Sequence, residues 1–149
     1  MQSRYVVLLY MIAGCATGYH ASGFGGGYSE LRLSERAWQV DFSGNRYTSP
    51  ERVHTFALRR AAELTLGSGY QVFYVAGENE GADQVNIQRP VNCQTNGAFT
   101  NCYGGGVQTI NKPRTRLTIT MATGPEGAQA PAGSLVYDAK MLLAQIPTD

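Results

Sequence analysis

The chain has 149 residues, of which 43% are hydrophobic and 15% are charged, and its formal net charge is +1. This length suits one domain with a real core, and the composition excludes a chain that is disordered throughout. A nearly neutral chain also lacks the excess of basic side chains that nucleic acids attract, so we expect no nucleic-acid partner.

The first segment of the chain predicts export. Arg4 gives a short positive region, and an apolar run over residues 5–12 follows it. That run is too short to cross a bilayer as a helix, which needs about 20 apolar residues. We therefore expect residues 1–14 to be a signal peptide. An ordinary cleaved signal without lipid and a buried first strand are the alternatives.

The residues after the apolar run, Ile12-Ala-Gly-Cys15, resemble the lipobox of bacterial lipoproteins. The resemblance implies lipidation: the Cys15 sulfur carries a diacylglyceryl group, the signal is cut before Cys15, and a fatty acid such as palmitate acylates the new amino group. Several acyl chains anchor a protein stably, whereas a single chain binds only marginally. In that family an aspartate after the cysteine favours the inner membrane. Because Ala16 stands here, we expect the periplasmic face of the outer membrane, with the inner membrane as the alternative.

The segment behind Cys15 predicts a tether. Residues 16–27 contain five glycines and no charged side chain, a composition typical of a flexible linker. We therefore expect a lipidated cysteine and glycine-rich tether over residues 15–27, followed by a single domain over residues 28–149.

Two segments at the start of this domain predict a β-hairpin. Residues 28–34 alternate weakly, and residues 36–44 alternate well, with Trp38, Val40 and Phe42 on one face. A sheet with one apolar face needs another element to cover it.

The next segment predicts that cover. Thr48 or Ser49 can cap a helix, and Pro50 suits its first position. Apolar residues then recur at helical spacing until a Gly-Ser-Gly sequence ends the pattern. We expect one amphipathic helix over residues 49–66.

Further strands and a last helix are predicted towards the C-terminus. We expect strands at 70–76, 84–88 and 116–121, an acidic loop over 77–84, and a helix at about 137–145. The expected fold class is α+β: a small, mainly antiparallel sheet packed against one long amphipathic helix, with a shorter C-terminal helix.

Two further cysteines, Cys93 and Cys102, lie in a polar insert near residues 89–106. In an oxidising periplasm such a pair commonly forms a disulfide, and we expect it to order a surface hairpin. The alternative is a redox or metal site. CxxC spacing is absent, and His20 and His54 have no ligand-like spacing to the cysteines. We expect a structural disulfide, no metal and no cofactor.

Motifs for catalysis are weak, and we assign no catalytic residue. Ser29 lacks the second glycine of a nucleophile elbow, and His54 fits a solvated helix surface. Glu78, Glu80 and Asp83 could gather a calcium ion, but their spacing differs from the EF-hand pattern. We expect a solvated acidic loop and a protein that is not an enzyme.

Most of the domain resembles a family of small Gram-negative cell-envelope lipoproteins of uncharacterised function. The sequence motifs that carry the resemblance are Gly-Tyr-Ser-Glu at 27–30, Phe-Ser-Gly-Asn at 42–45 and Ala-Leu-Arg-Arg-Ala-Ala-Glu-Leu-Thr at 57–65. The resemblance implies location and fold. It implies no catalytic residue, because the family has no assigned activity.

The sequence therefore favours a membrane-anchored lipoprotein that faces the periplasm, with a non-enzymatic structural or binding role. Its expected partners are the lipid bilayer, through the acyl chains on Cys15, and an envelope protein. The alternative is a tethered hydrolase or small-ligand carrier, with Tyr70, Tyr74 and Tyr103 lining its site.

Overall fold

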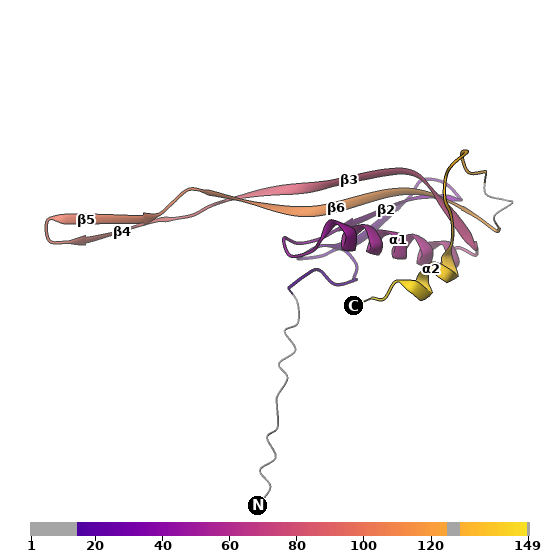
Figure 1. The fold of residues 1–149 in the computed structure, drawn as a ribbon, viewed down its shortest axis with the longest axis horizontal. Helices are drawn as coiled ribbons and strands as arrows, with labels where there is room; N and C mark the ends of the chain where they lie inside the picture. Colours follow the sequence, from indigo (N-terminus) through magenta and orange to yellow (C-terminus); the bar gives the residue numbers. More distant parts are fainter. Residues whose placement is uncertain (1–14, 125–128, 149) are drawn as a thin grey trace, which may run out of the picture.

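A computed structural model describes residues 15–124 and 129–148. The expected signal peptide, residues 1–14, lies outside the described residues. The fold combines a curled antiparallel sheet, two helices and a long projecting ribbon (Figure 1). In chain order the elements are β1 (Gly27–Arg32), β2 (Ala37–Ser43), α1 (Pro50–Gly67), β3 (Val72–Gln88), β4 (Val91–Asn96), β5 (Phe99–Gly104), β6 (Val107–Ala122), β7 (Val136–Asp138) and α2 (Ala139–Gln145).

The main sheet has five strands in the order β1-β2-β6-β3-β7, and every neighbouring pair is antiparallel. β4 and β5 form a separate two-stranded hairpin. Long β6 lies between β2 and β3, and its inner half carries the buried apolar residues Leu117, Ile119 and Met121. The predicted hairpin of the first two strands is confirmed, with Tyr28 opposite Phe42.

The expected α+β fold, with a small sheet packed against one long helix, is wrong. The protein is mostly β, with 49% strand and 19% helix, and its sheet curls into a half-barrel accompanied by two short helices. The difference arises because the two central strands continue far beyond their predicted ends. β3 has 17 residues and β6 has 16.

The expected acidic loop over residues 77–84 is also wrong, because these residues continue β3. Glycine and acidic residues have low β propensity, which favoured a loop. In the structure each of these residues has a partner in β6, for example Glu80 opposite Thr115 and Asp83 opposite Lys112. Paired backbone groups are satisfied without water, so the pairing overrides the weak local preference.

Helix α1 forms as the sequence predicts. It begins at Pro50, directly after the capping residue Ser49, whose hydroxyl accepts a hydrogen bond from the N–H of Arg52 at 3.2 Å. Its last turn ends where the N–H of Ser68 donates to the carbonyl of Leu64 at 2.9 Å. The helix therefore covers residues 50–67, one position from the expected range.

The hydrophobic core lies between the sheet and α1. Val40 and Phe42 of β2 are fully buried and Trp38 is partly buried, so the predicted inward face of this strand is confirmed. Burying each large apolar side chain contributes about 1.5–3 kcal/mol. The other large side chains of this core are Val53, Phe56, Phe73, Leu117, Ile119 and Met121.

Helix α2 is shorter than predicted and packs beside α1. Asp138 is the last residue of β7 and lies opposite Val72 of β3. It also caps α2, because its side chain accepts a hydrogen bond from the N–H of Met141 at 2.8 Å. The predicted start at Tyr137 therefore falls in the strand, where its ring lies 5.3 Å from that of Phe73. Arg59 of α1 donates to the carbonyl of Ile146 just after α2, which links the two helices.

The glycine-rich segment that we expected as a flexible tether packs on the domain. Thr17 is buried, and its backbone N–H donates to the hydroxyl of Thr48 at 2.8 Å. Gly27 has a φ of +116°, and a Cβ at this position would lie 2.6 Å from the carbonyl oxygen of His20. Glycine is therefore needed here for close packing rather than for flexibility.

Within the described residues, no helix is both long and apolar enough to cross a membrane.

Candidate functional site

The projecting ribbon, which we call the arm, comprises residues 83–112. It consists of the outer parts of β3 and β6 and the β4–β5 hairpin beyond them, and Figure 1 shows it extending well away from α1 and α2. From Gln84 to Gln88, β3 pairs only with β6, and no residue of β4 or β5 is buried. A two-stranded ribbon leaves the outer backbone groups of both strands open to another chain.

The arm carries almost no charge. Between Gln84 and Asn111, Arg89 is the only charged side chain. Amide and hydroxyl groups dominate instead, and the hydroxyl of Thr109 donates to the side chain of Asn86 at 2.8 Å across the two strands. Natural edge strands commonly carry charges that discourage pairing, and this arm lacks that protection.

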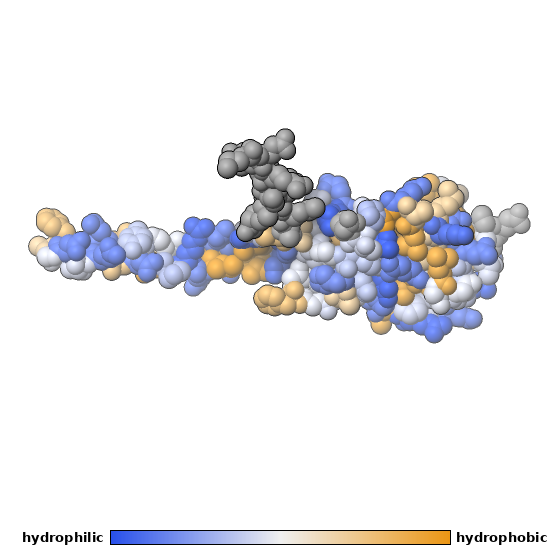
Figure 2. Space-filling view, turned by 90° about the horizontal axis from the view of Figure 1, so that it is seen from below, coloured by the Kyte–Doolittle hydropathy of each residue, from blue (hydrophilic) through white to orange (hydrophobic). Residues whose placement is uncertain are grey.

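Apolar side chains are exposed along the whole arm, between its base and its far end as well as at both. Near the base, Val85 and Ile87 of β3 lie on one face of the ribbon, and Ile110 of β6 lies opposite Val85. Val85 and Ile87 are each more than a third exposed. At the far end Phe99 is 77% exposed. Figure 2 shows apolar surface in both regions. Exposed apolar groups on a projecting element are typical of an interaction surface.

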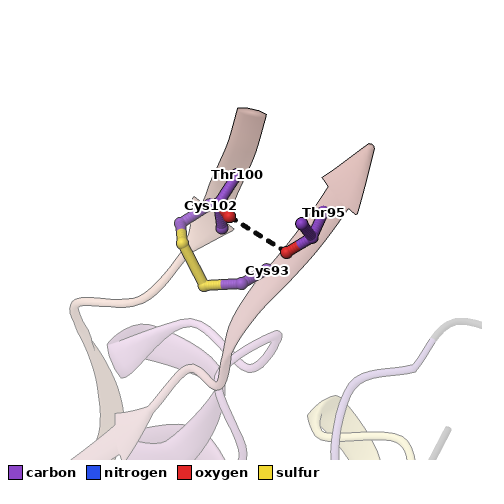
Figure 3. Close-up of a disulfide and its surroundings, with 4 residues drawn as sticks. All are labelled: Cys93, Thr95, Thr100 and Cys102. Carbon is purple, nitrogen blue, oxygen red and sulfur yellow. Dashed lines mark hydrogen bonds between the residues drawn. A yellow bond between two sulfur atoms is a disulfide. The ribbon is translucent and has the colours of Figure 1, made fainter. Parts of the chain in front are cut away.

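A disulfide crosses the tip of the arm. Cys93 and Cys102 are directly opposite one another, with their Sγ atoms 2.12 Å apart (Figure 3). A two-residue turn begins at Gly97, whose φ of +64° is favourable for glycine at the first position of such a turn. The expected surface hairpin with a cysteine pair is confirmed.

Cys15, the expected site of lipid attachment, is exposed and is not in a disulfide. Its backbone carbonyl accepts a hydrogen bond from Nδ2 of Asn45 at 2.6 Å, and the N–H of Asn45 donates to the hydroxyl of Thr17 at 2.8 Å. The chain is therefore held against the domain from its first described residue.

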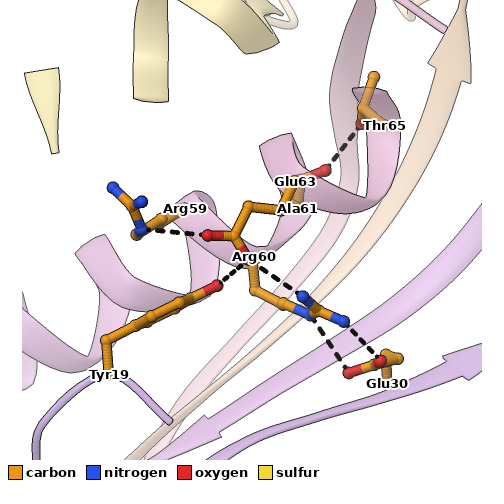
Figure 4. Close-up of polar contacts among 7 residues, drawn as sticks. All are labelled: Tyr19, Glu30, Arg59, Arg60, Ala61, Glu63 and Thr65. Carbon is orange, nitrogen blue, oxygen red and sulfur yellow. Dashed lines mark hydrogen bonds and ion pairs between the residues drawn. The ribbon is translucent and has the colours of Figure 1, made fainter. Parts of the chain in front are cut away.

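Tyr19 fastens the same segment to α1 (Figure 4). Its ring centroid lies 5.0 Å from that of Tyr28 and 5.4 Å from that of Phe56, and its hydroxyl donates to Glu63. Glu63 also accepts from Arg60 at 3.0 Å. Phe56 and Glu63 of α1 thus hold Tyr19 through ring packing and a hydrogen bond to a carboxylate, and Arg60 holds that carboxylate in place.

Two groups of this network have raised pKa values. Burial raises the pKa of Tyr19, and the neighbouring Glu63 carboxylate raises it further. For Arg60, burial opposes the charged form, but hydrogen bonds to Glu30 and Glu63 outweigh it and raise the pKa. Both side chains therefore keep their protons well into the alkaline range.

A depression of about 450 Å³ lies where the N-terminal segment meets the base of the arm. The glycine-rich turn around Phe24 forms one side, and Asp83 and Lys112 lie on the other. Phe24 is fully exposed at its rim.

A cluster of three titratable side chains, His54, Glu78 and Glu80, lies where α1 meets the base of the arm. Nδ1 of His54 lies 2.7 Å from Oε1 of Glu78 and 3.2 Å from Oε1 of Glu80. The three ligand-type atoms all lie within 4.8 Å of one another. A shallow pocket opens beside them, lined by Pro50, Glu51 and Thr55 together with His54 and Glu80 of the cluster. The cluster brings together one imidazole and two carboxylates, the donors that transition metals accept.

Glu78, Glu80 and Asp83, which the sequence offered as an alternative calcium site, are not brought together in the structure. Asp83 lies 3.4 Å from Arg114 and forms an ion pair with it, while Glu78 and Glu80 turn towards α1. A histidine therefore joins two of the three carboxylates. The sequence carried no clear signal for this, since His54 and Glu78 are far apart in the chain and no short motif includes both.

Ser29, the residue compared with a nucleophile elbow, lies on β1 with its side chain exposed, opposite Asp41 of β2.

A scan against protein-family models finds no match for this chain, and neither a search of curated proteins nor a search of solved structures finds one.

Proposed function

We propose that this protein is a lipid-anchored lipoprotein of the cell envelope, with its domain facing the periplasm, and that it binds another envelope component through the arm. The observation that carries the binding role is the arm itself: a nearly uncharged two-stranded ribbon that projects from a complete domain. A ribbon of this kind contributes nothing to the core of its own domain. A role in contacting another molecule accounts for its length.

The chemistry of the arm favours one mode of binding. Its open strand edges can accept an added strand through backbone hydrogen bonds, and alternate side chains such as Val85 and Ile87 then contact the partner. Because Arg89 is the only charge on its outer part, long-range attraction contributes little. Binding through the arm is therefore expected to change little with salt concentration.

The anchor rests on the lipobox-like sequence that ends at Cys15 and on the exposed position of that residue. The lipoprotein-like sequence of the domain and Ala16 favour the outer membrane. Because Asn45 and Thr48 hold the segment behind Cys15, the domain would lie close to the bilayer, and the arm would provide the reach that a free linker otherwise supplies.

The anchor is tested by Cys15→Ser in the full chain, with labelling by a fatty-acid analogue and fractionation of the envelope. We expect the variant to lose the label and to leave the membrane pellet. Cys93→Ser is the matched control, because it removes another cysteine and is expected to keep both. A Cys15→Ser protein that still carries the label would overturn the anchor.

The binding role is tested by placing a photo-crosslinking amino acid at Phe99 of the arm or at Met141 of α2. Both side chains are exposed and apolar, at 77% and 63%, so they are equally available to a nearby molecule. We expect a discrete crosslinked product in intact cells from position 99 and none from position 141. Equal products from both positions, or none from several positions on the arm, would contradict the proposal.

A further inference from the structure

His54, Glu78 and Glu80 meet because of an irregularity in β3. The pairing of β3 with β6 shifts between Val75 and Gly77. Before the shift, Val75 is opposite the buried Ile119. After it, the even-numbered residues take the inward side, so Glu78 is opposite the buried Leu117. A β-bulge of this kind re-aims side chains to the other face of a sheet.

The shift places two carboxylates on the face that otherwise carries the apolar core. Without it, Glu78 and Glu80 would point to the outer face, where solvent surrounds them. On the inner face they reach α1, and the side chain they meet is His54, which is 31% exposed. Both carboxylates stay partly hydrated, since the Glu78 side chain is 40% exposed and that of Glu80 is 57% exposed, and their two negative charges attract a cation to the space beside His54.

The charges at this position are not balanced by a permanent cation. Among the described residues, Glu78 and Glu80 form ion pairs only with His54. The other carboxylates that form ion pairs each have an arginine as their partner: Glu30, Asp41, Glu63 and Asp83. A neutral histidine leaves two negative charges on neighbouring side chains of one strand. A divalent cation would balance them.

Nδ1 of His54 is closed off from solvent but has no aligned hydrogen-bond partner among the described residues. It lies within ion-pair distance of both carboxylates, but neither contact has the direction of a hydrogen bond. Buried polar atoms in proteins are nearly always satisfied. The imidazole lone pair and the two carboxylates instead converge, as ligands do around an ion.

We propose that His54, Glu78 and Glu80 bind a divalent transition-metal ion of the Zn²⁺ type at the base of the arm. Zinc accepts imidazole nitrogen and carboxylate oxygen at about 2.0–2.2 Å, which places neighbouring tetrahedral ligands about 3.3 Å apart. The Nδ1–Oε1 distances of 2.7 and 3.2 Å reach that spacing after a small outward rotation of one glutamate. Three protein ligands leave a fourth position for water or for a group from a partner.

The ion would link α1 to the strand that continues into the arm. His54 lies in the second turn of α1, and Glu80 lies three residues before the arm begins. Binding only in the folded state stabilises that state by mass action. Metal binding would therefore hold the base of the arm against the domain, and this proposal does not depend on the lipid anchor.

The test measures Zn²⁺ and Co²⁺ binding to the untagged full chain carrying Cys15→Ser, so that the free thiol cannot act as a ligand. Calorimetry gives stoichiometry and affinity, and the visible absorption of Co²⁺ reports the ligand geometry. We expect one Zn²⁺ per chain, a higher Tm with metal, and weaker binding at acidic pH, because the ligating histidine must lose its proton.

Three variants locate the site. His54→Ala and the isosteric double change Glu78→Gln/Glu80→Gln should each weaken Zn²⁺ binding by at least about 10-fold. His20→Ala is the matched control, since it removes an exposed histidine of the N-terminal segment and should bind like the parent chain. Far-UV circular dichroism checks that each variant is folded. Parent-like binding by the folded glutamine variant, loss of binding in His20→Ala, or no uptake by the parent chain would each overturn the proposal.

Discussion

At the scale of single residues, Tyr19 decides how the N-terminal segment lies on the domain. Its ring packs against Tyr28 and Phe56, while its hydroxyl reaches Glu63 on α1. Arg59 also lies over the ring, with its guanidinium carbon 5.2 Å from the centroid. One side chain therefore combines apolar packing, a hydrogen bond to a carboxylate and a cation–π contact.

Tyr19→Phe tests this role through its pH dependence. The folded pKa of Tyr19 lies above its ordinary value of 10.0, so its contribution is complete below that value and is lost as pH rises through the folded pKa. At about pH 8 the variant should be less stable by about 1 kcal/mol, the net value of one hydrogen bond. The difference in free energy of unfolding between the two proteins should narrow by about pH 11, because the Tyr19 hydroxyl of the unfolded wild-type chain then releases its proton.

Urea unfolding of both proteins at the two pH values measures that difference. The other tyrosines are present in both proteins, so their pH-dependent contributions to stability cancel. A difference that stays constant with pH would show that the hydroxyl of Tyr19 is not held in its neutral form by the fold.

At the scale of elements, the β4–β5 hairpin is an independent unit at the end of the arm. None of its residues is buried, and it pairs with no other strand. Elements with few apolar contacts open locally long before the whole domain unfolds. The disulfide between Cys93 and Cys102 therefore acts on the local opening of the hairpin and not on the core.

The double change Cys93→Ser/Cys102→Ser should loosen the tip alone. The loop closed by this disulfide is short, so the chain-entropy estimate gives about 2–3 kcal/mol of stabilisation. We expect faster amide hydrogen exchange in residues 91–104 and an unchanged Tm for the domain. Hydrogen exchange read by mass spectrometry separates the two regions. A marked fall in Tm would mean that the tip supports the core, which would contradict this account.

At the scale of the whole molecule, the domain and the arm are energetically separable. Every residue of the hydrophobic core lies outside the arm. The strands β3 and β6 pair along their inner halves within the five-stranded sheet, and along their outer halves only with each other. Shortening the arm should therefore leave the sheet, α1 and α2 intact.

Replacing residues 84–111 by Asn-Gly tests this separation, because this dipeptide closes a two-residue hairpin between Asp83 and Lys112. We expect cooperative unfolding with a Tm within a few degrees of the parent chain, unchanged membrane fractionation, and loss of partner capture. Thermal unfolding followed by circular dichroism measures the first property. A shortened chain that fails to fold would show that the arm is part of the folding unit.

The sequence by itself determined the features that depend on neighbours within a few positions. Ser49 and Pro50 begin α1 because capping and φ are local properties. The alternation of Val40 with Phe42 predicts their burial because strand periodicity is local too. The cysteine pair also formed within one short hairpin, where two strands joined by a tight turn bring it together.

Only the tertiary structure decided the features that depend on distant partners. Residues 77–83 became strand because β6 was available to pair with them, and Thr17 became buried against the domain although the glycine-rich composition of its segment predicted a free linker. His54 met Glu78 and Glu80 because a bulge turned them inward. The physical reason is the same in each case: backbone pairing and burial across the chain outweigh weak local preferences, and no short stretch of sequence contains both partners.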